Sequence, residues 1–445
     1  MLGEKKLKQL ASQVLAYSTA DETEVLLMVN NNGLTRFANT QIHQHVAWND
    51  LGISVRCVIG KKIGVASTNS FADADLYQVV DKAISLAKLQ REDPFFVSLP
   101  EPKKIPAVQS EVFETTEEER GAAVNIILQK SKSKKIIASG AYASSMTEIA
   151  VANSHGVWAY HISSGCDLST ILLGETSTGF GAQVGRKNSD IDAENVANTA
   201  ISKVELGANP VDVEPGEWEV VLEPQSVNEM MTFLSFYGPN SRIYHEQASF
   251  FSGKLGTKVM NDNITIIDDP LNKDAFPMPF DFEGSPKKKL DIIRNGILKN
   301  IVYDSYDANR YKAENTGHAL PAPNVYGAIP LHLTFEPGKD HHEKLIKNIK
   351  KGLLVTRLWY VRVLNPKTLS ITGMTRDGLF LIKNGELAGG VKNLRFNQSI
   401  PLALNNVRAV SNDLVPLSSF ELELGINRMP YLHIANWNFT SGTTF

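Results

Sequence analysis

The stretch GISVRCVIGKKIGVAST, residues 52–68, sets the architecture of the first half of the chain. Apolar and polar residues alternate through its opening, and the glycine-bounded segment 60–64 then marks a tight turn. A period of two is typical of a strand with one buried face, and two such runs across a short turn predict antiparallel pairing. Two further strand-like runs, 24–39 and 41–50, come before it, so the sequence predicts an antiparallel meander.

Amphipathic helices are predicted on both sides of this meander, over 1–17 and 72–90. The whole pattern then recurs, with a helix over 116–133, strand-like runs over 137–164 and 166–185, and a closing helix over 191–205. Ala-Asn-Thr beginning at Ala38 matches Ala-Asn-Ser beginning at Ala152, and Ala-Ile-Ser occurs from Ala83 and again from Ala200. These offsets are nearly constant, which favours a helix–meander–helix unit present twice.

A segment rich in glycine and proline, 207–217, leads to a different second half. Apart from helices predicted over 226–236 and 339–352, it consists of short apolar runs and turns, and Asn295-Gly296 and Asn384-Gly385 predict hairpins. We therefore predict an α+β protein with two domains. Residues 1–205 form an N-terminal α/β domain of duplicated helix–meander–helix units, and residues 206–445 form a mainly antiparallel, barrel-like β domain.

The composition excludes several classes of function. The 45 basic and 48 acidic residues give a net charge of −3, and no basic run is long enough to follow a phosphate backbone. Two cysteines indicate a reducing compartment without a disulfide framework. No apolar run approaches the roughly 20 residues that span a bilayer. We expect a cytoplasmic protein that binds neither nucleic acid nor membranes.

Two His-Glu pairs raise the question of a zinc site. In the zinc-peptidase helix a second histidine follows the first after four residues, but Ser249 follows His245 at that spacing and Ile346 follows His342. Neither pair matches the motif, and we predict no metal at either.

Five stretches of the second half stand out together: KLGTKVMNDNITIIDDP (254–270), NGILKNIVYDSYDANRY (295–311), NTGHA (315–319), KGLLVT (351–356) and PYLHIANWNFTSGT (430–443). They resemble the PmbA/TldD family, also described as modulators of DNA gyrase. The resemblance implies bacterial and archaeal cytoplasmic metallopeptidases in which a zinc-bearing TldD-type subunit pairs with a zinc-less PmbA- or TldE-type subunit around a chamber that cuts peptides.

In the zinc-bearing members the metal helix carries His-Glu-x-x-x-His just after the first strand of the second domain. The matching segment here is VVLEPQSVNEMMTFLSF, residues 220–236. Asn228 replaces the first histidine, Glu229 is retained, and Phe233 replaces the second histidine. The resemblance also implies a ligand from a cysteine near the C-terminus, and no cysteine follows Cys166. We expect no zinc in this chain, no cofactor and no catalytic residue; zinc would belong to a TldD-type partner.

Four residues are candidates for a peptide cleft: Met230 on the degenerate metal helix, Tyr303 and Asp304 in VYDSYDA, and His318 in NTGHA. Structural interpretations stand beside this one, because a helix core, a turn and a hydrogen-bonding histidine use the same residue types. His43 and His45 on one strand are typical of a polar sheet face.

We predict the non-catalytic half of a TldD/TldE-type protease, which binds and degrades or matures peptides as a dimer with a zinc-bearing partner. Two alternatives stay open. One is a homodimeric peptidase with an unrecognised metal site, and the other is a regulator that interacts with DNA gyrase. The sequence identifies neither the substrate nor the partner.

Overall fold

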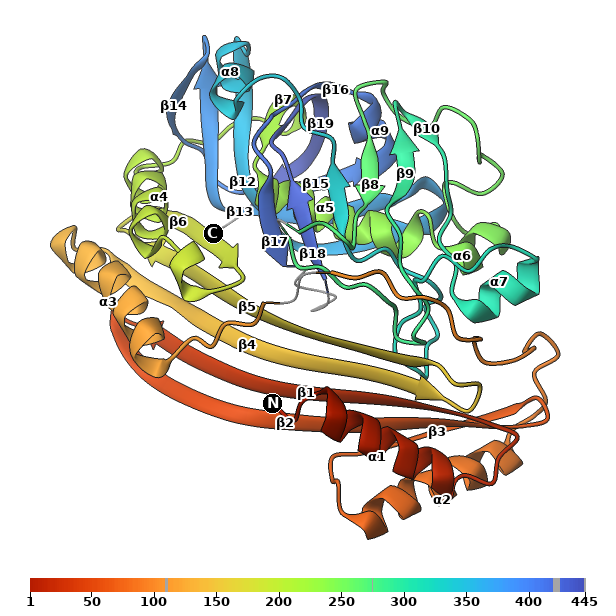
Figure 1. Cartoon of the computed structure of the whole chain (residues 1–445). Helices are drawn as coiled ribbons and strands as arrows, with labels where there is room; N and C mark the ends of the chain where they lie inside the picture. Colours follow the sequence, from red (N-terminus) through yellow and green to blue (C-terminus); the bar gives the residue numbers. More distant parts are fainter. Residues whose placement is uncertain (109–110, 274, 419–424, 444–445) are drawn as a thin grey trace.

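The computed structural model describes residues 1–108, 111–273, 275–418 and 425–443. A long curved sheet forms the lower layer in Figure 1, and a compact half built around a second, ring-shaped sheet lies across one face of it. This arrangement confirms the predicted α+β class.

The lower layer is a six-stranded antiparallel sheet in the order β3-β2-β1-β4-β5-β6. Its two meanders meet at the central pair β1 and β4, so each predicted repeat contributes one half of the sheet. The strands are β1 (Glu22–Ala38), β2 (Gln41–Ile59), β3 (Lys62–Thr68), β4 (Ile137–Asn153), β5 (Trp158–Leu173) and β6 (Thr178–Gly185).

Helices cover the outer face of this sheet in two pairs. Each pair buries its apolar side against its own repeat and against the central strand of the other repeat. Gly64 on β3 allows one close contact, because an added Cβ would lie 2.1 Å from the carbonyl oxygen of Ala83. Gly179 on β6 makes the equivalent approach, 2.1 Å from that of Ala200. The repeated Ala-Ile-Ser therefore marks where a helix meets an edge strand. The helices are α1 (Glu4–Tyr17), α2 (Asp73–Leu89), α3 (Glu117–Ser133) and α4 (Ala193–Leu206).

The upper half contains a sheet that closes on itself. Its strands follow the order β12-β7-β19-β15-β13-β14, and a direct pairing of β12 with β13 completes the ring. All of its pairings are antiparallel except β12 with β7. This confirms the barrel-like prediction. The strands are β7 (Gly216–Leu222), β12 (Lys351–Asn365), β13 (Ser370–Lys383), β14 (Glu386–Gly390), β15 (Leu394–Ser399), β16 (Val407–Val410) and β19 (Leu432–Gly442).

A smaller mixed sheet packs beside the ring, in the order β10-β9-β8-β11-β18-β17. The predicted Asn-Gly hairpins are both present, joining β9 to β10 and β13 to β14. Asn295 and Asn384 both have positive φ, as turns of this kind require. The strands of this sheet are β8 (Ile266–Asp268), β9 (Leu290–Arg294), β10 (Ile297–Leu298), β11 (Leu333–Phe335), β17 (Val415–Ser418) and β18 (Ile426–Met429).

Helices of the upper half differ from the prediction in two places. The segment predicted as helix over 339–352 is helical only in α8 (His342–Lys347), because β12 begins at Lys351. Residues 305–311, predicted to belong to the apolar runs and turns of this half, instead form α7 (Ser305–Tyr311), which Asp304 caps by accepting a hydrogen bond from the Asp307 amide. The remaining helices are α5 (Pro224–Tyr237), α6 (Ser241–His245) and α9 (Ile400–Asn405).

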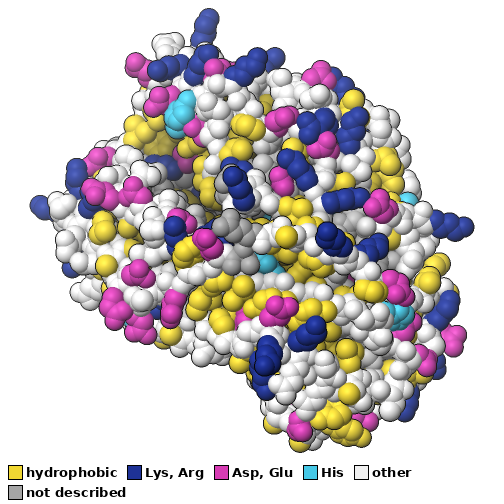
Figure 2. Space-filling model, in the orientation of Figure 1, with side chains coloured by type: hydrophobic (Ala, Val, Ile, Leu, Met, Phe, Trp, Pro, Cys, Tyr) yellow, Lys and Arg dark blue, Asp and Glu magenta, His cyan; other side chains and the backbone are white. Residues whose placement is uncertain are grey.

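Apolar contacts and one buried ion-pair triad join the two halves. Leu26 and Val151 of the long sheet belong to the same core cluster as Phe280 and Leu331 of the upper half. Arg56 on β2 lies 2.7 Å from a carboxylate oxygen of Glu24 and 3.0 Å from one of Glu283. Figure 2 shows hydrophobic side chains gathered along this junction, while acidic and basic side chains intermingle over the rest of the visible face. Among the described residues, no helix has the length and apolarity needed to cross a bilayer.

Candidate functional site

The helix that the resemblance singled out, α5, begins where β7 leaves the ring. Glu223 precedes it and Pro224 occupies its first turn, a position where the missing amide hydrogen costs nothing. The buried Glu223 carboxylate accepts hydrogen bonds from Lys203 Nζ at 2.6 Å and from Thr356 Oγ1 at 3.3 Å. The start of α5 is therefore tied both to α4 and to β12.

Asn228 is completely buried and uses both ends of its amide. Its Nδ2 donates to the carbonyl oxygen of Ser418 at 2.8 Å, and its Oδ1 accepts from Asn427 Nδ2 at 2.9 Å. Ser418 ends β17 and Asn427 lies on β18, so one side chain ties α5 to both strands of this hairpin. A buried amide bonded in this way is a structural link between backbone elements.

Phe233 and Met230 are core residues. Phe233 is 7% exposed and Met230 is fully buried, and both belong to the main cluster of the upper half. Met230 was a candidate for the peptide cleft, but its side chain is directed into the interior.

Glu229 lines a cleft of about 700 Å³ between α5 and the inner face of the long sheet. Apolar side chains form part of the lining, among them Ile171 of β5 and Phe180 of β6. Residues 417 and 418 of β17 line it as well. Largely apolar walls with a few polar groups are typical of ligand-binding clefts.

Arg357 brings positive charge to this cleft. Its guanidinium stacks over Phe180 at 4.6 Å and over Trp359 at 4.4 Å, and its Nε lies 3.5 Å from Asp377 Oδ2. Burial lowers the pKa of Arg357, and the charges of Asp377 and Glu229 act in the opposite direction. The cleft thus contains a carboxylate and a guanidinium from two different elements.

The remaining candidate residues do not lie in this cleft. Tyr303 donates to or accepts from His245 Nε2 at 2.9 Å, and His245 stacks on Tyr311 with ring centroids 3.8 Å apart. His318 is fully buried, with Nε2 3.0 Å from Asp268 Oδ2 and Nδ1 2.9 Å from Thr316 Oγ1. These contacts identify both residues as parts of hydrogen-bonded packing.

Burial acts to raise the pKa of Asp268, but the hydrogen bond and charge of His318 hold it well below its usual range. The pair is therefore an internal link of the upper half.

Asp304 lines a separate cleft of about 600 Å³ at the other end of the junction, next to Arg56 and Glu283. Burial raises the pKa of Asp304 to about 7, and the charges of Glu283 and Asp307 add to the effect. The four candidate cleft residues are therefore spread over the upper half, and only Asp304 lines a cleft described above.

A group of potential metal ligands lies elsewhere, at the start of α8. His341 Nε2 is 2.8 Å from Asp413 Oδ1, and His342 Nδ1 is 3.2 Å from Asp413 Oδ2, so the donor atoms of the three residues lie within 4.8 Å of one another. The His342 ring stacks on Tyr431 with centroids 4.2 Å apart. The adjacent histidines are visible in the sequence, but Asp413 is about 70 residues away, and no local spacing indicates that it joins them.

A long antiparallel sheet packed against a closed ring of strands, with a helix that presents a carboxylate to the cleft between them, defines a class of two-part α+β proteins. Comparison with known proteins identifies the family. The PmbA/TldA metallopeptidase C-terminal domain matches residues 215–441, the central domain of that family matches 109–206, and its domain 1 matches 23–87. The chain belongs to the PmbA/TldD metallopeptidase family.

Similar proteins of this family cover nearly the whole chain. A metalloprotease PmbA homolog from Haemophilus influenzae is 24% identical over an alignment 446 positions long, which covers 94% of each chain. Metalloprotease PmbA from Escherichia coli O157:H7 is 24% identical over 84% of this chain and 83% of its own.

Two crystal structures share the fold. TldE from Thermococcus kodakarensis superposes with a TM-score of 0.87 at 22% identity, covering 98% of this chain and 99% of its own. A protein from Thermotoga maritima described as a putative modulator of a DNA gyrase gives 0.83 at 17% identity, covering 98% of this chain and all of its own. At these identities the likeness establishes the fold alone.

Proposed function

We propose that this chain is the zinc-less subunit of a TldD/TldE-type protease and contributes the α5 cleft to a peptide-binding chamber. The proposal rests on the contacts made by the residues at the metal-helix positions. Asn228 hydrogen-bonds through both amide atoms to β17 and β18, and Phe233 packs in the core. Zinc takes imidazole, thiolate or carboxylate donors, and catalytic sites take three of them from the protein. Of the three family positions only Glu229 retains such a donor, so these residues do not fit zinc.

The cleft itself supports peptide binding. β6 is an edge strand of the long sheet, and Phe180, Ala182 and Val184 along it line the cleft. An extended peptide laid beside an edge strand gains main-chain hydrogen bonds with little dependence on its sequence, while apolar walls hold its side chains. The chain would then bind and orient a peptide, and a TldD-type partner would supply the metal that activates water.

Reconstitution tests the proposal. The purified chain alone should leave an unfolded peptide intact and contain far less than one equivalent of zinc after dialysis. Adding a family member that carries His-Glu-x-x-x-His should produce hydrolysis. Trp359 also lines the α5 cleft. Trp359→Ala should then raise KM by about tenfold with little change in kcat, because it removes apolar contact that substrate and transition state share. If the His-Glu-x-x-x-His family member hydrolysed the peptide equally well without this chain, the proposal would be contradicted.

The His341–His342–Asp413 group favours one second candidate, a homodimeric peptidase with its own metal. Two imidazoles and a carboxylate suit zinc, although they lie at the start of α8 and line none of the clefts described above. The double substitution His341→Ala, His342→Ala separates the two candidates. Under the main proposal it leaves reconstituted hydrolysis unchanged. Stoichiometric zinc in the chain alone, lost together with hydrolysis in this variant, would establish the second candidate.

A further inference from the structure

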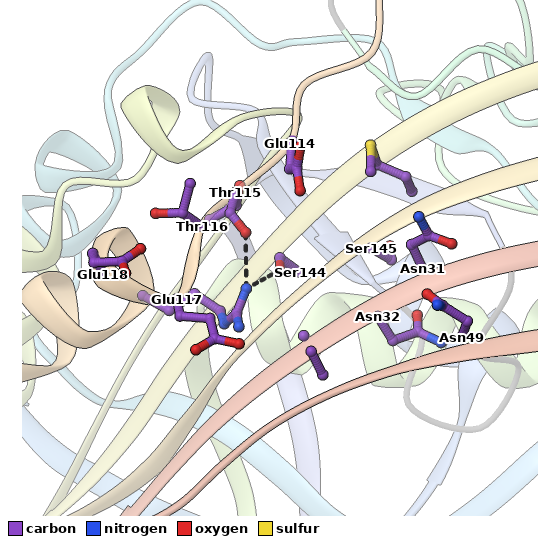
Figure 3. Close-up of a pocket in the computed structure, with 14 residues that line it drawn as sticks. Asn31, Asn32, Asn49, Glu114, Thr115, Thr116, Glu117, Glu118, Ser144 and Ser145 are labelled. Carbon is purple, nitrogen blue, oxygen red and sulfur yellow. Dashed lines mark hydrogen bonds between the residues drawn. The ribbon is translucent and has the colours of Figure 1, made fainter. Parts of the chain in front are cut away.

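A small polar pocket of about 270 Å³ lies on the helix-bearing face of the long sheet. Asn31 and Gly33 of β1 line it. They lie on the same face of the strand as Leu27 and Val29, which pack against the helices of the first repeat. The first turn of α3 closes one side. Figure 3 shows Asn31, Asn32 and Asn49 on one side of the pocket and Glu114, Glu117 and Glu118 on the other. This pocket is separate from the α5 cleft, which opens on the inner face.

The pocket contains a buried arginine that has no carboxylate of the described residues at ion-pair distance. Arg120 is 3% exposed, and its Nη1 donates to the Thr115 carbonyl oxygen at 2.8 Å and to Ser144 Oγ at 3.0 Å (Figure 3). Its Nε has no hydrogen-bond partner. No carboxylate of the described residues lies at ion-pair distance from it, although the charge of the exposed Glu118 acts on it from further away. Burying a cation without a counter-charge is costly, so an unpaired guanidinium in a pocket points to an anionic ligand.

Two other arginines of the chain have the carboxylate partners that Arg120 lacks at ion-pair distance. Arg294 binds Asp291 through two hydrogen bonds of 2.7 Å, donated by Nε and Nη2. Arg56, which is also largely buried, has two carboxylates beside it. Arg120 differs from both, although its guanidinium is held in place from several sides. A Cβ at position 33 would lie 2.2 Å from Arg120 Nη1, so the guanidinium rests directly on the bare backbone of Gly33.

The rim of the pocket limits the kind of anion. Glu114, Glu117 and Glu118 are exposed at the start of α3, and their charge repels a simple anion. If the ligand also carries an ammonium group, these glutamates attract that group instead of repelling the ligand. The amide groups of Asn31 and Asn49 supply donors and acceptors for a peptide or amide unit between the two charges. The volume lies at the small end of ligand pockets, which excludes a long chain.

We propose that this pocket binds a small zwitterion of the amino acid or dipeptide class. The ligand carboxylate approaches the Arg120 guanidinium, and the ligand ammonium faces the glutamates of α3. Because the pocket lies on the opposite face of the sheet from the α5 cleft, the proposal does not rest on the proposed peptidase function.

Calorimetric titration of the full chain tests the proposal with three probes: L-alanyl-L-alanine, its C-terminal amide and its N-acetyl derivative. We expect the free dipeptide to bind. The amide should bind about 10- to 100-fold more weakly, because it loses a charge-assisted hydrogen bond to a buried partner. N-acetylation should weaken binding less, because the glutamates are exposed. Absence of binding by the free dipeptide at millimolar concentration, or equal binding of acid and amide, would overturn the proposal.

Variants locate the binding. Arg120→Met keeps the length and apolar stem of the side chain and should abolish dipeptide binding, whereas Arg408→Met, at an exposed arginine of β16, should leave it unchanged. Unchanged binding in Arg120→Met would overturn the proposal. Glu114→Gln lies at the exposed rim and removes no buried contact, so it provides a second test if Arg120→Met does not fold. It should weaken binding of the free dipeptide but not of its N-acetyl derivative, and equal effects on both would also count against the site.

Discussion

The start of α5 and the start of α8 contrast sharply in what they offer a metal. α5 borders a cleft of about 700 Å³, but Asn228 and Phe233 there are committed to hydrogen bonding and packing. At α8 two imidazoles and a carboxylate converge, yet the side chain of His341 is 54% exposed. A catalytic metal needs donors and an enclosed cleft at one place. In this chain the three donors line none of the clefts described above. Four substitutions test this separation of donors and cleft.

Phe233→His, which places a potential metal donor back on α5, should have the largest effect on the free energy of unfolding. It removes a phenyl ring from the core and buries an imidazole in its place, so we expect a loss of about 3–5 kcal/mol in the free energy of unfolding. Chemical denaturation with and without zinc measures it, with the exposed Leu402→Ala of α9 as a near-neutral control. A zinc-dependent recovery of stability would show that α5 can still form a metal site.

Asn228→Ala should have the next largest effect. It leaves the Ser418 carbonyl and the Asn427 amide without their buried partner, which we expect to cost about 2–3 kcal/mol. Asn198→Ala on α4 is the matched control, because its exposed side chain should contribute little and alanine favours helix. Equal unfolding midpoints for the two variants would mean that the amide does not hold the hairpin.

Asp304→Asn extends the comparison to a carboxylate inside a cleft. Since burial raises the pKa of Asp304 to about 7, the folded state favours the protonated form, and the native protein loses stability as pH rises from about 4 to about 7. Asparagine cannot ionise and still caps α7. The variant should therefore gain on the order of 1 kcal/mol over the native protein above pH 7, with the difference vanishing towards pH 4. Urea denaturation across this range measures it, and a difference independent of pH would contradict it.

His341→Ala should have the smallest effect. Its ring is half exposed, and a surface ion pair contributes little, so we expect a change below about 0.5 kcal/mol. A chelator should then shift the thermal midpoints of the native protein and the variant equally. If the chelator destabilised the native protein alone, the α8 group would hold a structural metal.

Much of the fold could be predicted because its determinants are local. The alternating residues of 52–68 and the strands on either side of each Asn-Gly turn pair with segments close by in the sequence. α7 was missed because its cap, Asp304, also suits a turn and the helix has only seven residues. The boundary at 205/206 stays a prediction.

The candidate site was less accessible from the sequence. The family resemblance placed Asn228, Glu229 and Phe233 on one helix, but the partners of Asn228 lie about 190 residues away. Asp413 and the unpaired state of Arg120 depend in the same way on tertiary contacts. Long-range packing therefore decides which polar residues are structural links and which face a cleft.

A local twofold axis passes through the centre of the long sheet. Asn31 pairs with Met146, the residue 115 positions later, and this is also the spacing that relates the two repeats. Each residue at this point therefore faces its own counterpart, which in an antiparallel pair defines a local twofold axis. Two identical half-length chains would build the same sheet around that axis as a symmetric dimer. Arg120 belongs to the second repeat alone, because the residue 115 positions before it is the exposed Lys5, so the pocket beside the axis breaks this symmetry.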